Sequence, residues 1–230
     1  MLKPAMLPRT LISRALRAFS FVLGVCYWVA LPAYPYTASP VVKGLSIAAL
    51  GVLPWISRQG LDRPGAGLLS GALFASAVGD VLLDIDPERL FVPGLCAFLA
   101  AHLVYTALFA RNGGRFRNVG LYRGVSLAGV WIYVVLFWLW LMPSLGPLKI
   151  AVTTYICAIT AMATTALFSR FNARVAAGAL LFVISDSLIA VAKFKTPVPA
   201  RGYLVWATYF AAQYLIATGA LGGKVPAPIE

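Results

Sequence analysis

The sequence predicts an all-α protein, a polytopic integral membrane bundle of about eight transmembrane helices that forms one domain over residues 1–230. Of these 230 residues, 61% are hydrophobic and only 11% are charged, whereas soluble domains are about 45–50% apolar and about 25% charged. The apolar residues form long runs, and short links with charged residues, proline or glycine separate the runs. A water-soluble fold could not bury this much apolar surface, so the solvent around the protein must be lipid.

Eight runs are long enough to span a bilayer, which requires about 20 mostly apolar residues in a helix. The predicted spans are roughly 15–33, 40–57, 66–85, 90–110, 121–142, 147–168, 174–193 and 202–221. Links such as RQGLDRPG (58–65) and KTPVPAR (195–201) divide them. The second span is short, and the eight spans leave no room for a second, soluble domain.

The basic residues predict how the chain is oriented in the membrane. The net charge is +12, but the basic side chains lie singly between apolar runs and form no patch, so no nucleic-acid partner is expected. With the N-terminus in the cytoplasm, 13 of the 19 Lys and Arg residues fall in inner segments and 6 in outer segments, as the positive-inside rule favours. The inner residues are Lys3, Arg9, Arg14, Arg17, Arg58, Arg63, Arg111, Arg115, Arg117, Arg123, Arg170, Arg174 and Lys224, and the outer ones are Lys43, Arg89, Lys149, Lys193, Lys195 and Arg201. We therefore expect both termini in the cytoplasm, in a bacterial inner or plasma membrane or a eukaryotic endoplasmic reticulum. A seven-span alternative would place the C-terminus on the other side.

The cysteines and the single histidine argue against a metal site. Cys26, Cys96 and Cys157 lie in different apolar runs without a CxxC pair, so neither a disulfide framework nor a structural zinc site is predicted. One histidine cannot form the three-histidine site of a zinc hydrolase. We expect no metal and no cofactor.

Two acidic residues, Asp80 and Asp186, lie inside predicted spans. An ionisable group at the centre of a bilayer costs about 2.5–3.5 kcal/mol, and such residues usually face the bundle interior and mark a site. The alternative is that each carboxyl only binds a neighbouring helix. The five other acidic residues are assigned to loops, helix ends or the tail, and these are Asp62, Asp84, Asp86, Glu88 and Glu230.

The surroundings of the two aspartates also resemble each other. Gly71, Ala75 and Gly79 form a stripe of small residues before Asp80, and such stripes let helix backbones approach closely. The segment GALFASAVGDVLL (71–83) resembles GALLFVISDSLIA (178–190), which contains Asp186. The bundle would then consist of two related four-helix halves, although chance similarity of two short apolar segments explains the match equally well.

Further polar side chains lie at helical spacings in the later spans. His102 is near the middle of the fourth span, with Tyr105 on the same face, and Tyr209 and Gln213 share a face of the eighth. A lone histidine in a bundle can also be a hydrogen-bonded packing group. Lys43, at the start of the second span, can likewise extend toward the headgroups as a snorkelling lysine.

Three segments together resemble the lysoplasmalogenases, the YhhN-type multi-pass membrane proteins. The segment 79–109 has the family's Gly-Asp pair and the later Gly, Phe, His-Leu-x-Tyr and Phe, at Gly79, Asp80, Gly94, Phe98, His102, Leu103, Tyr105 and Phe109. The segment 178–194 matches a Ser-Asp motif through Ser185, Asp186, Lys193 and Phe194. The segment 208–217 matches a Thr-Tyr-Tyr-x-Ala-Gln motif, except that Phe210 replaces its second tyrosine. Lys43 matches a family lysine, and the resemblance extends from about residue 40 to 221.

The resemblance implies an eight-helix hydrolase that cleaves the vinyl ether of lysoplasmalogen to a fatty aldehyde and glycerophosphoethanolamine or glycerophosphocholine. Cleavage begins with protonation of the outer alkene carbon, which creates an oxocarbenium ion. A buried carboxyl keeps its proton more readily, and a second carboxylate can stabilise the cation and activate water. We therefore expect Asp80 and Asp186 to form an acid–base pair in one polar cavity, with His102 as an orienting or proton-relaying residue.

The expected partners are a lysophospholipid substrate and the lipid bilayer, and the oligomeric state is left open. Lys43 is expected to meet the phosphate. The other residues expected to bind substrate, headgroup or water are Tyr105, Tyr155, Ser185, Tyr209 and Gln213. Two other functions are compatible with buried acidic residues: a proton-coupled transporter of lipids or small molecules, and a non-catalytic membrane scaffold.

Overall fold

The computed structural model describes residues 9–57, 60–114 and 121–223. Six charged residues considered above lie outside these ranges, namely Lys3, Arg58, Arg115, Arg117, Lys224 and Glu230. The described chain contains eight long helices: α1 (Arg9–Ala30), α2 (Ser39–Ile56), α3 (Arg63–Ile85), α4 (Phe91–Arg111), α5 (Leu121–Leu141), α6 (Lys149–Phe168), α7 (Ala173–Phe194) and α8 (Arg201–Leu221). Short 3₁₀ turns, η1 (Leu31–Ala33), η3 (Met142–Ser144) and η4 (Gly146–Leu148), extend three of the helix ends.

All eight helices are long and apolar enough to cross a membrane. This confirms the predicted all-α fold and the eight predicted spans. The bounds differ by a few residues, most at α1, which begins at Arg9 and not near residue 15. Polar side chains start two of the helices: Asp62 accepts a hydrogen bond from the Gly65 N–H, and Asn172 accepts one from the Arg174 N–H, as is typical of N-cap residues.

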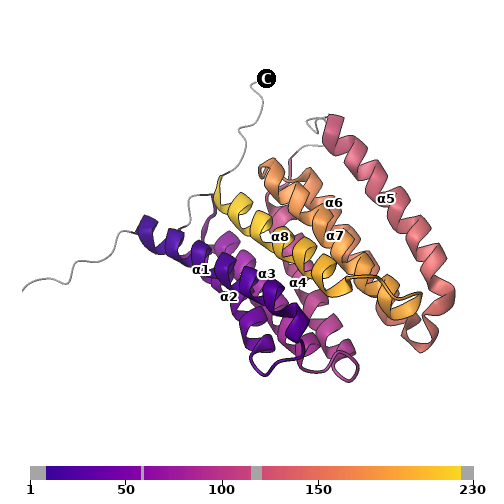
Figure 1. The fold of residues 1–230 in the computed structure, drawn as a ribbon. Coiled ribbons are helices and arrows are strands. Elements are labelled where there is room, and N and C mark those ends of the chain that lie inside the picture. The colour runs from indigo at the N-terminus through magenta and orange to yellow at the C-terminus, as the bar shows by residue number, and fades with distance from the viewer. Residues whose placement is uncertain (1–8, 58–59, 115–120, 224–230) are drawn as a thin grey trace, which may run out of the picture.

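Seven of the helices form a closed arrangement, and α5 lies outside it. Each helix in the series α1, α2, α3, α4, α6, α7 and α8 packs against the next one, and α8 also contacts α1 and α2. The fifth helix lies at the edge of the bundle, where it packs mainly against α6 (Figure 1). The indole of Trp138 on α5 donates a 3.1 Å hydrogen bond to the hydroxyl of Thr153 on α6.

Small residues allow two helix pairs to pack closely. A Cβ atom added to Gly79 of α3 would come within 2.6 Å of the Phe98 ring on α4. One added to Gly178 of α7 would come within 2.7 Å of the Ala212 carbonyl oxygen on α8. These contacts bring α3 against α4 and α7 against α8, and these helices carry Asp80 and Asp186.

Candidate functional site

Asp186 lies in a hydrogen-bonded group formed by three helices. The hydroxyl of Tyr155, on α6, donates a 2.6 Å hydrogen bond to Oδ2 of Asp186, on α7. The Nε2 atom of His102, on α4, is 2.9 Å from that hydroxyl and 3.4 Å from the same carboxyl oxygen. The fold thus brings together three of the predicted site residues, which are separated by 31 to 84 positions in the chain.

Tyr155 lies between the other two residues of this group. Its hydroxyl donates to Asp186 and contacts Nε2 of His102, where the histidine tautomer decides which atom donates. His102 is fully buried, and among the described residues its Nδ1 atom has no hydrogen-bond partner. Two of the three contacts, those from Tyr155 and His102, converge on Oδ2, and the other carboxyl oxygen of Asp186 stays available to a ligand. The Asp186 side chain is 15% exposed, so it is reachable from outside the packed core.

Asp80 belongs to a second group, on the inner side of α3. Its Oδ2 atom accepts a 2.6 Å hydrogen bond from the hydroxyl of Tyr209 on α8. That hydroxyl accepts a 3.2 Å bond from the Gln213 amide, whose oxygen in turn accepts a 2.6 Å bond from the hydroxyl of Tyr105 on α4. These four side chains are buried, and their polar atoms satisfy one another.

Lys43 joins this second group through two carboxylates. Its Nζ atom is 3.8 Å from Asp80 and 3.6 Å from Asp84, and it lies over the rings of Tyr27 and Trp206. The expected phosphate role of Lys43 is therefore poorly supported, because its charge already faces two anions. Snorkelling toward headgroups does not describe it either, because the side chain is only 17% exposed.

Asp84 lies at the C-terminal end of α3, within the expected set of loop, helix-end and tail positions, but its side chain is buried. It accepts hydrogen bonds of 2.6 Å from Tyr27 and 2.5 Å from Ser39, and these bonds tie α1 and α2 to α3. The sequence contains an indication that Asp84 faces the bundle interior, because Asp84 follows Asp80 by four residues and shares its helix face. Sequence reasoning missed Tyr27 and Ser39 as well, since neither residue type at these places indicates an acidic partner.

Aromatic rings pack against both groups. The Phe182 ring is 4.7 Å from the His102 ring on one side and 5.3 Å from the Tyr209 ring on the other, measured between centroids. Phe98 packs edge-on against both Phe182 and Tyr209. Asp80 and Asp186 thus have separate hydrogen-bond partners, and Phe182 packs against one ring from each group.

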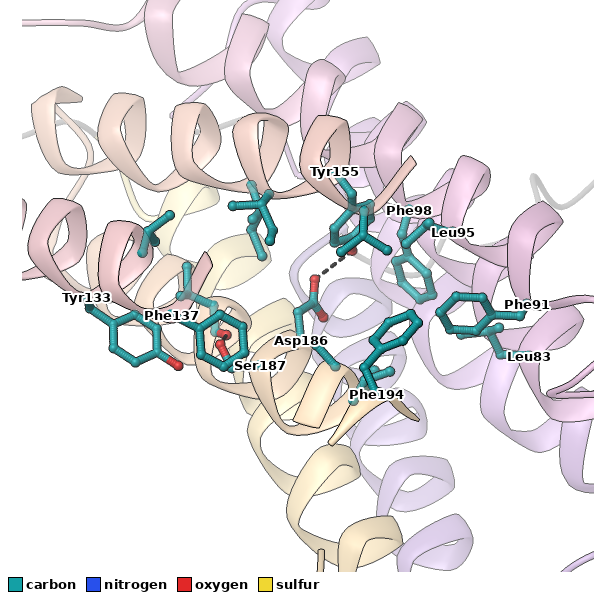
Figure 2. Close-up of a pocket in the computed structure, with 17 residues that line it drawn as sticks. Leu83, Phe91, Leu95, Phe98, Tyr133, Phe137, Tyr155, Asp186, Ser187 and Phe194 are labelled. Atoms are coloured by element: carbon teal, nitrogen blue, oxygen red, sulfur yellow. Dashed lines mark hydrogen bonds between the residues drawn. The ribbon is translucent and has the colours of Figure 1, made fainter. Parts of the chain in front are cut away.

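A cavity of about 70 Å³, partly open to the surroundings, lies between α5 and the other helices. Its walls are mainly aliphatic and aromatic side chains from α3, α4, α5, α6 and α7. Among the described residues that line it, Asp186 is the only acidic one, and Tyr155 stands beside it (Figure 2). Asp80 and His102 do not line this cavity.

Comparison with known proteins identifies the family. The profile of the YhhN family matches residues 38–220, which is most of the chain. This protein belongs to the YhhN family.

Curated relatives in this family cover most of both chains. The chain is 35% identical to human "Lysoplasmalogenase TMEM86B" over 206 residues, which is 87% of this chain and 83% of the relative. It is 32% identical to bovine "Lysoplasmalogenase TMEM86A" over 84% of this chain and 82% of the relative. It is 39% identical to the "Lysoplasmalogenase" of Mycobacterium tuberculosis over 66% of this chain and 60% of the relative. No solved structure matches the chain.

Two remaining positions of the YhhN motifs have packing roles in this structure. Ser185 is fully buried, and its hydroxyl donates a 3.2 Å hydrogen bond to the Val205 carbonyl of α8, so it joins α7 to α8 and does not face the cavity. Phe210, in place of the second tyrosine, packs against α1, where a Cβ on Gly24 would come within 2.6 Å of its ring. Phe210 thus has no hydroxyl to offer, and its ring forms a packing contact between α8 and α1.

Proposed function

We propose that this YhhN protein is a lysoplasmalogenase, an ether hydrolase that converts lysoplasmalogen to a fatty aldehyde and glycerophosphoethanolamine or glycerophosphocholine. Relatives with this name cover more than four-fifths of the chain at 32–35% identity. The observation that carries the proposal is a single carboxyl, Asp186, in a cavity whose walls are otherwise mainly apolar. Such a cavity suits a ligand with a long hydrocarbon chain and one reactive polar linkage.

The first chemical step would be proton transfer from Asp186. The carboxyl proton moves to the outer carbon of the C=C bond, whose electron pair forms the new C–H bond. The carbon attached to oxygen becomes an oxocarbenium centre, and the carboxylate left behind stabilises this cation. A low-dielectric environment strengthens the attraction between the carboxylate and the cation after this step.

Water would complete the hydrolysis. A water molecule adds to the oxocarbenium carbon and returns one proton to the Asp186 carboxylate, which leaves a hemiacetal. The hemiacetal hydroxyl then loses its proton, the ether oxygen gains one, and the bond between that carbon and the ether oxygen breaks. The products are a fatty aldehyde and the glycerophospho alcohol, and the acid is regenerated.

His102 and Tyr155 would position the acid. Both contact Oδ2 of Asp186, so they orient the carboxyl and leave Oδ1 to hold the transferable proton. Asp80 would be the second carboxylate of the mechanism, acting through its negative charge and without contact with the substrate. Tyr105, Tyr209 and Gln213 would fix Asp80 in that place, which revises their expected role as substrate-binding residues.

The test is an aldehyde-release assay on the purified protein in detergent, with lysoplasmalogen and an ester-linked lysolipid side by side. We expect aldehyde from the first, no hydrolysis of the second, and slower turnover in D₂O because a proton is transferred to carbon. A detergent solution holds no gradient, so release of aldehyde also excludes the transporter alternative as the whole function. Equal cleavage of the ester would instead make the protein a general lysolipase.

We infer that the chain crosses the membrane with both termini in the cytoplasm. Eight spans support termini on one side, and the excess of basic residues in the inner segments supports the cytoplasmic side. A reporter fused after residue 230 should therefore read as cytoplasmic. An external signal would support the opposite orientation or an odd number of spans.

A further inference from the structure

Lys193 lies at one end of the cavity, next to two phenylalanine rings. Phe91 and Phe194 both line the cavity, and their ring centroids are 6.1 Å apart. The Nζ atom of Lys193 is 5.1 Å from the centroid of the Phe91 ring, so its positive charge lies at this end. Tyr133 and Phe137 of α5 line the other side, and Asp186 lies between the two pairs of aromatic residues (Figure 2).

The spacing along α7 matches the length of a lysophospholipid headgroup region. Lys193 follows Asp186 by seven residues, which is two helical turns on one face and about 10 Å of rise. Five bonds separate the vinyl ether oxygen of a lysoplasmalogen from its phosphorus atom. A ligand with its vinyl ether at Asp186 would therefore place its phosphate within reach of the Lys193 side chain, and its hydrocarbon chain would extend toward Tyr133 and Phe137.

Lys193 already binds an anionic group that a ligand could replace. Its Nζ atom is 2.5 Å from Oε2 of Glu88, whose side chain is 78% exposed in the link between α3 and α4. An exposed ion pair of this kind contributes little to stability, so exchange of the carboxylate for a phosphate is easy. Lys43 differs, because its two acidic partners, Asp80 and Asp84, are buried.

We propose that Lys193 binds the phosphate of a lysophospholipid at the Phe91–Phe194 end of the cavity, and that Glu88 competes with this phosphate. The proposal rests on the proposed function for the position of the vinyl ether at Asp186. It assigns the headgroup to the end of α7 and not to Lys43.

The experiment measures binding without turnover. The probes are a saturated 1-O-alkyl lysophosphocholine, which cannot be hydrolysed as a vinyl ether, and the 1-O-alkylglycerol that lacks its phosphate. We expect the wild type to bind the phosphate-bearing lipid more tightly. Lys193→Gln should weaken that binding on the order of tenfold, because a charge-assisted contact is lost, and should leave the alkylglycerol affinity unchanged.

Two further variants separate binding from folding. Glu88→Gln removes the competitor, so it should tighten binding of the phosphate-bearing lipid, an effect that a damaged fold would not give. Lys149→Gln is the matched control, because Lys149 is an exposed lysine at the start of α6 and should leave both affinities unchanged.

Several results would overturn the proposal. They are an undiminished preference for the phosphate-bearing lipid in Lys193→Gln, no binding of this lipid by the wild type, and equal affinity for soluble glycerophosphocholine or inorganic phosphate. The last result would indicate a site for free phosphate. Binding that depends on Lys193 without any aldehyde release would remove the proposed reaction and keep the phosphate site. Cleavage with a KM that does not depend on Lys193 would support the proposed reaction and remove the phosphate site.

Discussion

The Tyr155 hydroxyl lies 2.6 Å from Oδ2 of Asp186 and donates a hydrogen bond to that oxygen. The bond joins α6 to α7 at the wall of the cavity and leaves Oδ1 of the carboxyl without a partner among the described residues. An acid held by one oxygen and open at the other is well placed to donate a proton to a ligand.

Asp186→Asn should abolish most of the aldehyde release. Asparagine keeps the shape of the side chain but supplies no acidic proton, and a positioned acid–base group contributes about 10²–10⁴-fold to the rate. Initial rates with lysoplasmalogen measure the loss. Ser187→Ala is the control, because Ser187 lines the same cavity and should retain near-normal rates. Near-normal activity of Asp186→Asn would remove this residue from catalysis.

Asp80→Asn should reduce turnover less than Asp186→Asn does. Asp80 does not line the cavity, so only its charge can influence the cation. The ratio of the two variant rates, measured on preparations with equal thermal stability, tests this difference. A larger loss in Asp80→Asn would place the proton donor in the buried group and not at the cavity.

Tyr155→Phe and His102→Gln should each lower kcat by about tenfold with little change in KM. Each variant disturbs the orientation of the Asp186 carboxyl while the apolar cavity stays intact, so the chain of the substrate binds as before. Steady-state kinetics with lysoplasmalogen separate the two constants. A raised KM at unchanged kcat would show that these side chains bind the substrate and do not position the acid.

Asp84→Asn should destabilise the bundle. Tyr27 and Ser39 donate to different oxygens of Asp84, and the amide nitrogen of asparagine can replace neither acceptor. Lys43 also loses one of its two anionic partners, and a hydrogen bond or ion contact of a charged buried group contributes about 1–3 kcal/mol. The apparent melting temperature in one detergent measures the effect. Asp62→Asn is the control, because its ion pair with Arg111 is half exposed and the new residue still caps α3. Equal melting temperatures for both variants would contradict a structural role of Asp84.

Ala190→Phe should block the cavity. Ala190 lines it one helical turn beyond Asp186, so a phenyl ring there would occupy the space between the acid and the Phe91–Phe194 end. We expect kcat/KM for lysoplasmalogen to fall by at least about tenfold while the protein stays folded. Ala207→Phe, at an exposed position of α8, should have no such effect. If both variants remained fully active, the substrate would have to bind elsewhere.

The membrane-spanning class, the number of helices and the presence of Asp80, His102 and Asp186 inside them could be predicted from the sequence. These properties depend on local features: the length of each apolar run and the cost of an ionisable group within it. The family motifs added the reaction class, because their spacing over three separate segments is specific.

Which polar residues contact one another depends on how the helices pack in three dimensions. A hydropathy pattern does not define how helices rotate and tilt against one another, so it could not give Asp80 and Asp186 separate hydrogen-bond partners or bury Asp84 against Tyr27 and Ser39. The cavity depends on the position of α5 outside the other seven helices, and no residue of α5 indicates this by itself. Partners across helix interfaces arise from packing at long sequence separation, and a single sequence read along its length does not contain those distances.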